Sequence, residues 1–382
     1  MKISQRGLFW RPTHVPARGL VGLAIAAVLV LITVENWKSD DSIADYDTML
    51  RASATVESAI EILKPIRGAI EPINPEVDPF LTGFIGVASS SITSTSGQLE
   101  AKQTAVNPNW AAVVVRLLRE AGVEPGDTVA IAVSGSFPMM NLAVYAAVEA
   151  MGLRPIIIAS ASASQWGANV PGFTWIDMAR ELREAGIIRS KAVAATLGGR
   201  RDRALGIPRN GEESLRRSIE RAGLPLIEPG NLEDAVARRI ATYQEAAAGE
   251  PFAALINVGG GSATTGPDAI DHFFDNGLIR AAPNRAFSVP SVMGYFLGQN
   301  TPVIHLSGMA SLAARHGLPS PPSEQPRLGE GGVYTSQSYQ RWLAAAGVLF
   351  LLALTALVMR SANIALTIRD PDSRGSTMKP KV

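Results

Sequence analysis

The chain has 382 residues, with 35 Lys and Arg against 34 Asp and Glu, a formal net charge of +1 and no cysteine. This balance of charge gives no basic field for nucleic acid, and the lack of cysteine excludes disulfides and thiolate metal sites. Charged residues make up 18% of the chain, below the roughly 25% of an average globular protein, partly because two long segments carry no charge.

Two uncharged apolar segments, residues 19–34 and 342–359, lie near the ends of the chain. A membrane-spanning helix needs about 20 apolar residues, with about 17 as a lower limit. The first segment is slightly short, but Arg18 can snorkel at one end and Trp37 can sit in the headgroup layer at the other. Transmembrane helices are therefore predicted at 19–37 and 341–360.

Two alternatives to this prediction are weaker. A buried helix of a soluble domain rarely has an apolar surface on all sides with Arg at one end and Trp at the other. A cleaved signal peptide would fit the basic start of the chain, but residues 34–37 (Val-Glu-Asn-Trp) lack the small-x-small cleavage pattern. We therefore expect the first segment to be an uncleaved anchor.

Charges beside the two segments predict the orientation in the cell membrane. Residues 1–18 hold four basic residues and no acid, and residues 361–382 are also mainly basic. Because cytoplasmic loops carry the excess of Lys and Arg, both termini are predicted to be cytoplasmic and the central region extracytoplasmic.

Residues 38–106 are predicted to form a helical stalk followed by a Ser/Thr-rich entry segment. Apolar residues recur with helical spacing between 43 and 66, which indicates an amphipathic helix near the membrane. Pro72, Pro75 and Pro79 then interrupt the pattern. The stretch 87–98 is dominated by Ser and Thr, and the sequence leaves open whether it is a loop or a polar strand beside a ligand.

From residue 107 onward the pattern is regular. Helices are predicted at 107–120, 141–151, 173–185, 212–222 and 232–247, and strands at 128–133, 155–160, 192–197, 224–227, 252–258 and 302–306. Continuous apolar strands that alternate with amphipathic helices favour a parallel sheet covered on both faces. Residues 107–340 are therefore predicted to form a doubly wound α/β domain with a mostly parallel sheet.

Ligands of such sheets bind outside the carboxyl ends of the strands, and the loops expected there are rich in Gly and Ser. Glycine turns let backbone N–H groups face an anion, and arginines add forked donors for carboxylates. We predict a site for a ligand with carboxylates or amides; the alternative is that small residues only permit tight turns and the arginines are solvated. The predicted ligand-binding residues are Ser134, Gly135, Ser136, Ser164, Trp166, Asn169, Gly198, Gly199, Arg200, Arg201, Asn257, Gly259, Gly260 and Gly261.

A nucleophilic serine is a second interpretation of the same loops. Ser134 or Ser136 follows one predicted strand, and His305 lies on another, so the pair would supply a nucleophile and a base. The surrounding residues do not form the G-x-S-x-G pattern of the nucleophile elbow. Ser134, Ser136 and His305 are therefore candidate catalytic residues, without a motif that supports them.

Metal and nucleotide chemistry are less favoured. Asp268, Asp271, His272 and Asp275 have the spacing of one helical face, but acids also favour the first turn of an exposed helix, here opened by Pro267. No Gly-Lys dipeptide occurs, so a Walker A loop is missing, and no G-x-G-x-x-G follows the first strand. We expect no metal, no cofactor and no ATP-driven ligation on this chain.

Several strings in the central region resemble the poly-γ-glutamate system protein family. The resemblance covers roughly residues 40–340 and extends to the layout of the terminal anchors. The strings are Val133–Pro138 (VSGSFP), Ser164–Asn169 (SQWGAN), Phe173–Asp177 (FTWID), Leu197–Gly199 (LGG), Ile256–Gly261 (INVGGG), Pro302–Leu306 (PVIHL) and Gly329–Gly331 (GEG).

The resemblance implies a role and partners. Members of the family are linked to poly-γ-glutamate synthase components and are thought to assist polymer synthesis or export. It implies an accessory membrane protein that binds or guides the anionic polymer, beside membrane and cytoplasmic synthase components. An enzyme that cleaves or transfers γ-glutamyl amide bonds, and a scaffold without a ligand, are the alternatives. Because no activity is established for the family, the resemblance assigns no catalytic residue.

Overall fold

The computed structural model describes residues 17–42, 45–267 and 273–361. It divides into two compact units. One comprises residues 42–335, and the other is built from the terminal segments up to residue 41 and from residue 336 onward.

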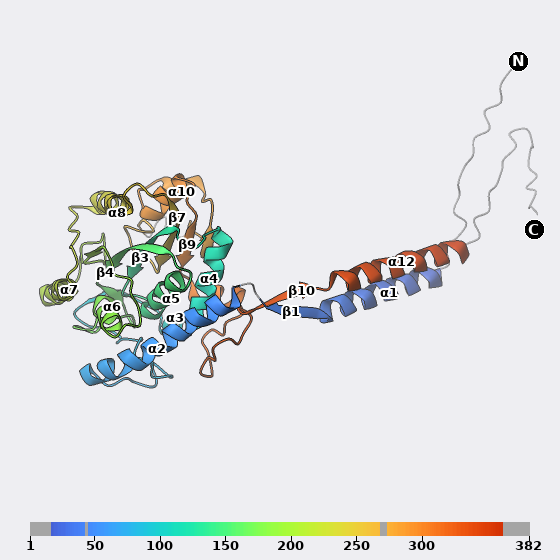
Figure 1. The fold of residues 1–382 in the computed structure, drawn as a ribbon, viewed down its shortest axis with the longest axis horizontal. Coiled ribbons are helices and arrows are strands. Elements are labelled where there is room, and N and C mark those ends of the chain that lie inside the picture. The colour runs from blue at the N-terminus through green and yellow to red at the C-terminus, as the bar shows by residue number, and fades with distance from the viewer. Residues whose placement is uncertain (1–16, 43–44, 268–272, 362–382) are drawn as a thin grey trace, which may run out of the picture. The chain divides into compact units, whose positions relative to one another are not determined.

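The larger unit is a mixed α/β structure with one main sheet (Figure 1). Its sheet has six strands in the order β6-β4-β3-β7-β9-β8, all parallel except β8, which runs antiparallel to β9. The predicted α/β class with a mostly parallel sheet is thus confirmed. The strands of this sheet are β3 (Thr128–Ser134), β4 (Arg154–Ser160), β6 (Ala194–Thr196), β7 (Phe252–Val258), β8 (Gly277–Ile279) and β9 (Val303–Leu306).

The helices of this unit follow the predicted alternation with the strands. Gly122, at φ 87°, ends α4 in the left-handed conformation that glycine adopts most easily, and the Asn231 side chain accepts a hydrogen bond from Asp234 N at the start of α8. The helices are α2 (Tyr46–Ile70), α3 (Leu99–Ala105), α4 (Trp110–Ala121), α5 (Pro138–Ala150), α6 (Trp175–Glu184), α7 (Arg209–Arg221), α8 (Leu232–Ala247), η1 (Asn284–Phe287), α10 (Val292–Gly298) and α11 (Met309–Arg315).

Apolar side chains are buried on both faces of the sheet because successive residues of a strand point in opposite directions. Val129, Ile131 and Val133 of β3 join a core with residues of α2, α4, α5 and α6. Ala130 of the same strand joins a second core with residues of α8 and α10. Figure 1 shows α2 and α5 on one side of the strands and α8 and α10 on another.

The segment predicted as a stalk contributes α2 and α3 to this unit. Met49, Val56 and Leu63 of α2 are buried in the same core as α4 and α5. The Tyr334 hydroxyl lies 2.7 Å from Ser53 Oγ of α2 and 2.7 Å from Asn109 Oδ1, so it ties the end of the unit to its start. The Ser/Thr-rich stretch holds the short strand β2 (Thr93–Thr95), which pairs in parallel with β5 (Ala163–Ser164).

Two details differ from the predicted elements. Residues 224–227 form no strand; a single bridge joins Leu226 to Ala195 beside β6, where Pro225 has no N–H to continue a ladder. The antiparallel strand β8 was not predicted, because three residues are too few for an alternating pattern to be recognised.

The smaller unit pairs two apolar helices. α1 (Ala17–Asn36) and α12 (Arg341–Ser361) are each long and apolar enough to cross a membrane. They lie side by side, and a Cβ atom added at Gly347 would stand 2.5 Å from Val30 Cγ1, so the glycine permits close contact. Strands β1 (Lys38–Ser42) and β10 (Thr335–Tyr339) pair with each other.

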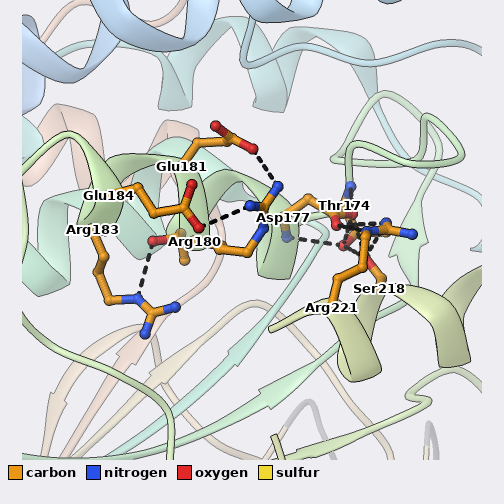
Figure 2. Close-up of polar contacts among 9 residues, drawn as sticks. Thr174, Asp177, Arg180, Glu181, Arg183, Glu184, Ser218 and Arg221 are labelled. Atoms are coloured by element: carbon orange, nitrogen blue, oxygen red, sulfur yellow. Dashed lines mark hydrogen bonds and ion pairs between the residues drawn. The ribbon is translucent and has the colours of Figure 1, made fainter. Parts of the chain in front are cut away.

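A buried carboxylate joins the start of α6 to α7 (Figure 2). Asp177 is 3% exposed and accepts hydrogen bonds from Thr174 N at 2.9 Å, from the Ser218 hydroxyl, and from Arg221 Nη2 at 2.6 Å. Thr174 Oγ1 in turn accepts from Asp177 N, which completes a capping box. One of the strings that carry the family resemblance, 173–177, therefore has a structural role here.

Replacing Asp177 with alanine should lower the free energy of unfolding by about 2 kcal/mol. The substitution removes the Asp177 half of the capping box, and it takes away the carboxylate that accepts from the Ser218 and Thr174 hydroxyls. Glu184→Ala is the matched control: its exposed carboxylate receives one hydrogen bond from Arg180, at 2.9 Å, and should change stability by less than about 0.5 kcal/mol. Urea unfolding of both variants measures the difference, and equal costs would contradict this role of Asp177.

Candidate functional site

The strand order creates a switch point between β3 and β7. From β3 the chain passes through α5 to β4 on one side, and it returns through α8 to β7 on the other side of β3. The loops that leave β3 and β7 therefore diverge at the carboxyl edge of the sheet, which is where a crevice forms in open α/β sheets. In this chain these loops are residues 135–137 and 259–266.

A polar cavity of about 470 Å³ occupies this position and is called the main cavity below. Its size is within the usual range of small-ligand sites. Residues from the ends of β3, β4 and β7, from β2 and its neighbours, and from the loops 198–205 and 260–266 line it. The predicted residues among them are Ser134, Ser136, Gly198, Gly199, Arg200, Asn257, Gly260 and Gly261.

A second cavity of about 570 Å³ adjoins the main one. The two share Thr95, Ser96, Ser136 and Gly260 in their linings, so they are neighbours. Ser164, another predicted residue, lines this second cavity together with parts of α3 and the start of α11.

Five predicted residues line neither cavity: Gly135, Trp166, Asn169, Arg201 and Gly259. Asn169 is fully buried, and its amide binds the backbone of Val87 on both sides, accepting from N at 2.9 Å and donating to O at 2.8 Å. It thereby holds the loop that leads to β2. Gly135 has a packing role, because an added Cβ would lie 2.9 Å from Ala163 Cβ.

The structure does not bring His305 to the candidate serines. His305 Nδ1 lies 2.9 Å from the amide nitrogen of Asn257, and His305 lines neither cavity. Burial lowers the pKa of His305 to about 4, so it is neutral at physiological pH. Within the described ranges no hydrogen bond joins it to Ser134 or Ser136. Its contact with Asn257 joins the carboxyl ends of β9 and β7.

A buried ion pair forms one wall of the main cavity and was not predicted. Arg239 of α8 and Asp202 are 2% and 4% exposed, with Nε 2.7 Å from Oδ2 and Nη2 3.0 Å from Oδ1. Arg239 also donates to Ser160 Oγ and Thr196 Oγ1, both at 2.8 Å. This network fixes the loop 198–205 against the ends of β4 and β6, in a backbone that holds Asp202 at φ 60°.

Several residues that line the main cavity carry hydrogen-bond donors without a partner among the described residues. Arg200 lines it and forms no ion pair with the described residues. The backbone N–H groups of residues 260–263 donate to no described group, because the turn bonds of this loop begin at Thr264 N. The Ser162 hydroxyl is buried and also lacks a partner in the described chain. Arg200 and the N–H groups of residues 260–263 are donors of the kind that bind the oxygen atoms of an anion.

Lys102 of α3 is the other residue that sequence reasoning missed. It is 4% exposed and lines the second cavity. Its Nζ lies 2.9 Å from Ser164 Oγ, 2.5 Å from the backbone oxygen of Ser136 and 3.6 Å from the centre of the Phe137 ring. Burial lowers the pKa of Lys102 to about 7.

The metal alternative of the sequence falls on residues 268–272, which lie outside the described residues; Asp275 is exposed. In the ranges that the structure describes, no three His, Cys, Asp or Glu side chains gather as metal ligands.

Comparisons of the chain with protein-family models, with curated proteins and with solved structures found no match.

Proposed function

We propose that the larger unit binds an anionic, carboxylate-bearing polymer at the carboxyl edge of its sheet. The observation that carries the proposal is the main cavity, a polar space at the β3–β7 switch point that is lined by donors without partners. Most of its lining residues are Gly, Ser, Thr or Ala, and such small side chains let a ligand approach the backbone closely.

The charges in the lining support an anion. Asp202 is the acidic residue of the lining, and Arg239 neutralises it within a buried pair. Arg200 therefore remains as a surplus positive charge. The guanidinium of an arginine has the forked geometry that binds a carboxylate through two hydrogen bonds.

The ligand class that we propose is poly-γ-glutamate, which presents one carboxylate on each repeating unit. The resemblance of the strings around 133–138, 164–169 and 256–261 to the poly-γ-glutamate system family supports this choice, because all three strings place residues in the linings of the two cavities. Ligation of glutamate would belong to cytoplasmic and membrane synthase components, with which this chain would act as an accessory protein in synthesis or export.

We further propose that α1 and α12 span the cell membrane, and that residues 42–335 form a doubly wound domain on the outer side. The length and apolar character of both helices, with no buried residue in α1, support the spans. The basic residues that precede α1 and follow α12 in the sequence support cytoplasmic termini. In this arrangement the cavities would lie on the side of the membrane to which the polymer is exported.

Replacing Arg200 with alanine should weaken the binding of poly-γ-glutamate about tenfold, because one charge-assisted contact is lost. Arg203→Ala is the matched control, since Arg203 carries the same charge on the same loop, is exposed and does not line the main cavity. The measurement is calorimetric titration of the full chain in detergent micelles at low and moderate salt.

Three outcomes of this titration separate the candidate roles. Salt-sensitive binding that Arg200→Ala weakens and Arg203→Ala retains would support the proposal. Equal losses in both variants would assign the effect to general charge and contradict a site at the main cavity. No binding by the wild-type chain would contradict the proposal and favour a scaffold without a ligand.

A further inference from the structure

The contact between Lys102 and Ser164 has the geometry of a nucleophile and its base. The two side chains come from α3 and β5, and their Nζ and Oγ atoms are 2.9 Å apart. That distance is within the reach that general-base catalysis requires. Both residues line the second cavity, so a ligand there can approach them.

The burial of Lys102 favours its neutral form. Nζ is enclosed by the Phe137 ring, the Ser136 carbonyl and the Ser164 hydroxyl. Among the residues that the structure describes, no carboxylate forms an ion pair with it. Burial without a counter-charge lowers the pKa of the amine to about 7, so a large fraction is unprotonated at neutral pH. An unprotonated amine has the lone pair that a base needs.

Ser164 is the serine best placed to react. The Ser164 hydroxyl has Lys102 as its hydrogen-bond partner, whereas Ser136 Oγ accepts from Ser164 N at 3.1 Å and Ser134 Oγ accepts from Ser136 N at 3.4 Å. The two serines predicted from the sequence therefore bind backbone groups. Ser162 lies near the same loops, but it has no base beside it.

We propose that Ser164 and Lys102 form a catalytic pair that transfers acyl groups, with Ser164 Oγ as the nucleophile and Lys102 Nζ as the general base. The substrate class is an amide or ester of a carboxylic acid, and the γ-amide bonds of the polymer are the substrate where the proposed function holds. This assignment deepens that function, and the choice of polymer rests on it.

The reaction balances with water as the second reactant. Lys102 Nζ takes the proton of the Ser164 hydroxyl while Oγ attacks the carbonyl carbon, and the carbon–nitrogen bond then breaks. The leaving amine takes the proton from Lys102, and an acyl ester remains on Ser164. Water attacks the ester and gives its proton to Lys102, the ester bond breaks, and the proton returns to Ser164. An amine in place of water would give transfer to a new chain.

The position of the second cavity beside the main one fits this chemistry. A chain held by Arg200 in the main cavity would pass residues 95–96, Ser136 and Gly260, which line both cavities, before it reached Ser164. Binding of the polymer's carboxylates in the main cavity would thus position a different part of the chain, with its γ-amide bond, beside Ser164.

The first experiment treats the full chain in detergent micelles with a fluorophosphonate probe, which reacts with activated serines and needs no polymer binding. We expect one covalent adduct on the peptide that contains Ser164, and a labelling rate that rises as the pH increases through about 7. Ser164→Ala and Lys102→Met should each reduce the labelling rate at least 100-fold. Ser58→Ala and Lys191→Met, at exposed side chains, should keep it.

Lys102→Met also removes a contact to the Ser136 carbonyl, so thermal unfolding is measured for each variant. Ser164→Ala removes only a hydroxyl group. It keeps the test valid if the lysine variant does not fold. Labelling of another serine, no labelling of the wild-type chain, or a rate that does not change with pH would overturn the assignment. Labelling at Ser164 in a chain that neither binds nor shortens poly-γ-glutamate would uphold the pair and contradict the polymer as its substrate.

Discussion

Replacing Arg239 with methionine is expected to lower the free energy of unfolding by about 3 to 5 kcal/mol, because it leaves the buried Asp202 carboxylate without its positively charged partner. The Ser160 and Thr196 hydroxyls lose a donor in the same change. Chemical unfolding followed by the fluorescence of the buried Trp110 and Trp175 measures the cost.

Arg238 provides the matched control for this variant. It is the neighbouring residue of α8, and its ion pair with Asp234 is exposed. Arg238→Ala should cost less than about 1 kcal/mol. In a double-mutant cycle, Asp202→Asn with Arg239→Met should cost less than the sum of the single changes, since both charges are then removed together. A small cost for Arg239→Met, equal to that of Arg238→Ala, would contradict the role of the pair in fixing the loop 198–205.

Replacing Gly86 with alanine should destabilise the larger unit by about 3 kcal/mol, because the added methyl group has no space. Its Cβ would lie 2.0 Å from Gly167 O and 2.2 Å from Asn169 Oδ1. The loop 84–95 would have to move, together with β2 and the cavity wall at 94–96. Thermal unfolding and polymer titration of the same sample measure both effects.

Gly68→Ala is the control for this change. Gly68 is exposed on α2, and nothing lies within 4 Å of an added Cβ atom. Alanine is the better helix former, so this variant should be more stable by about 0.5 to 1 kcal/mol. A Gly86→Ala protein as stable as wild type would show that the loop 84–95 is not packed as described.

The sequence predicted the elements with strong periodicity well. The helix 232–247 was predicted with the bounds that the structure gives, and the strand predicted at 128–133 differs from β3 by one residue. The residues that these elements bury are mostly apolar and recur with the period of a strand or a helix, so the pattern is visible in the sequence. The edge of the sheet was predicted less well, because β8 is short and residues 224–227 pair at a single bridge.

The residues at the strand ends of the candidate site were predicted from the sequence, whereas the buried charged residues on its helices were not. Strand ends in a parallel sheet meet at one edge, so Ser134, Arg200 and Gly260 were expected near one another, and they line the same cavity. Lys102 and Arg239 were not expected, because on a helix each appears as an ordinary solvated cation. Their burial depends on partners 62 and 37 residues away, Ser164 and Asp202, and no local pattern reports such contacts.

Hydrogen exchange of the full chain in lipid nanodiscs, with and without short γ-glutamate oligomers, tests most directly whether an anionic polymer binds in the main cavity. We expect slower exchange in residues 94–96, 198–205 and 260–266, which surround the main cavity. The effect should weaken with added salt and in Arg200→Ala, because the interaction is electrostatic. Protection confined to other parts of the larger unit, or no protection at oligomer concentrations that saturate binding, would contradict an anion site at this edge of the sheet.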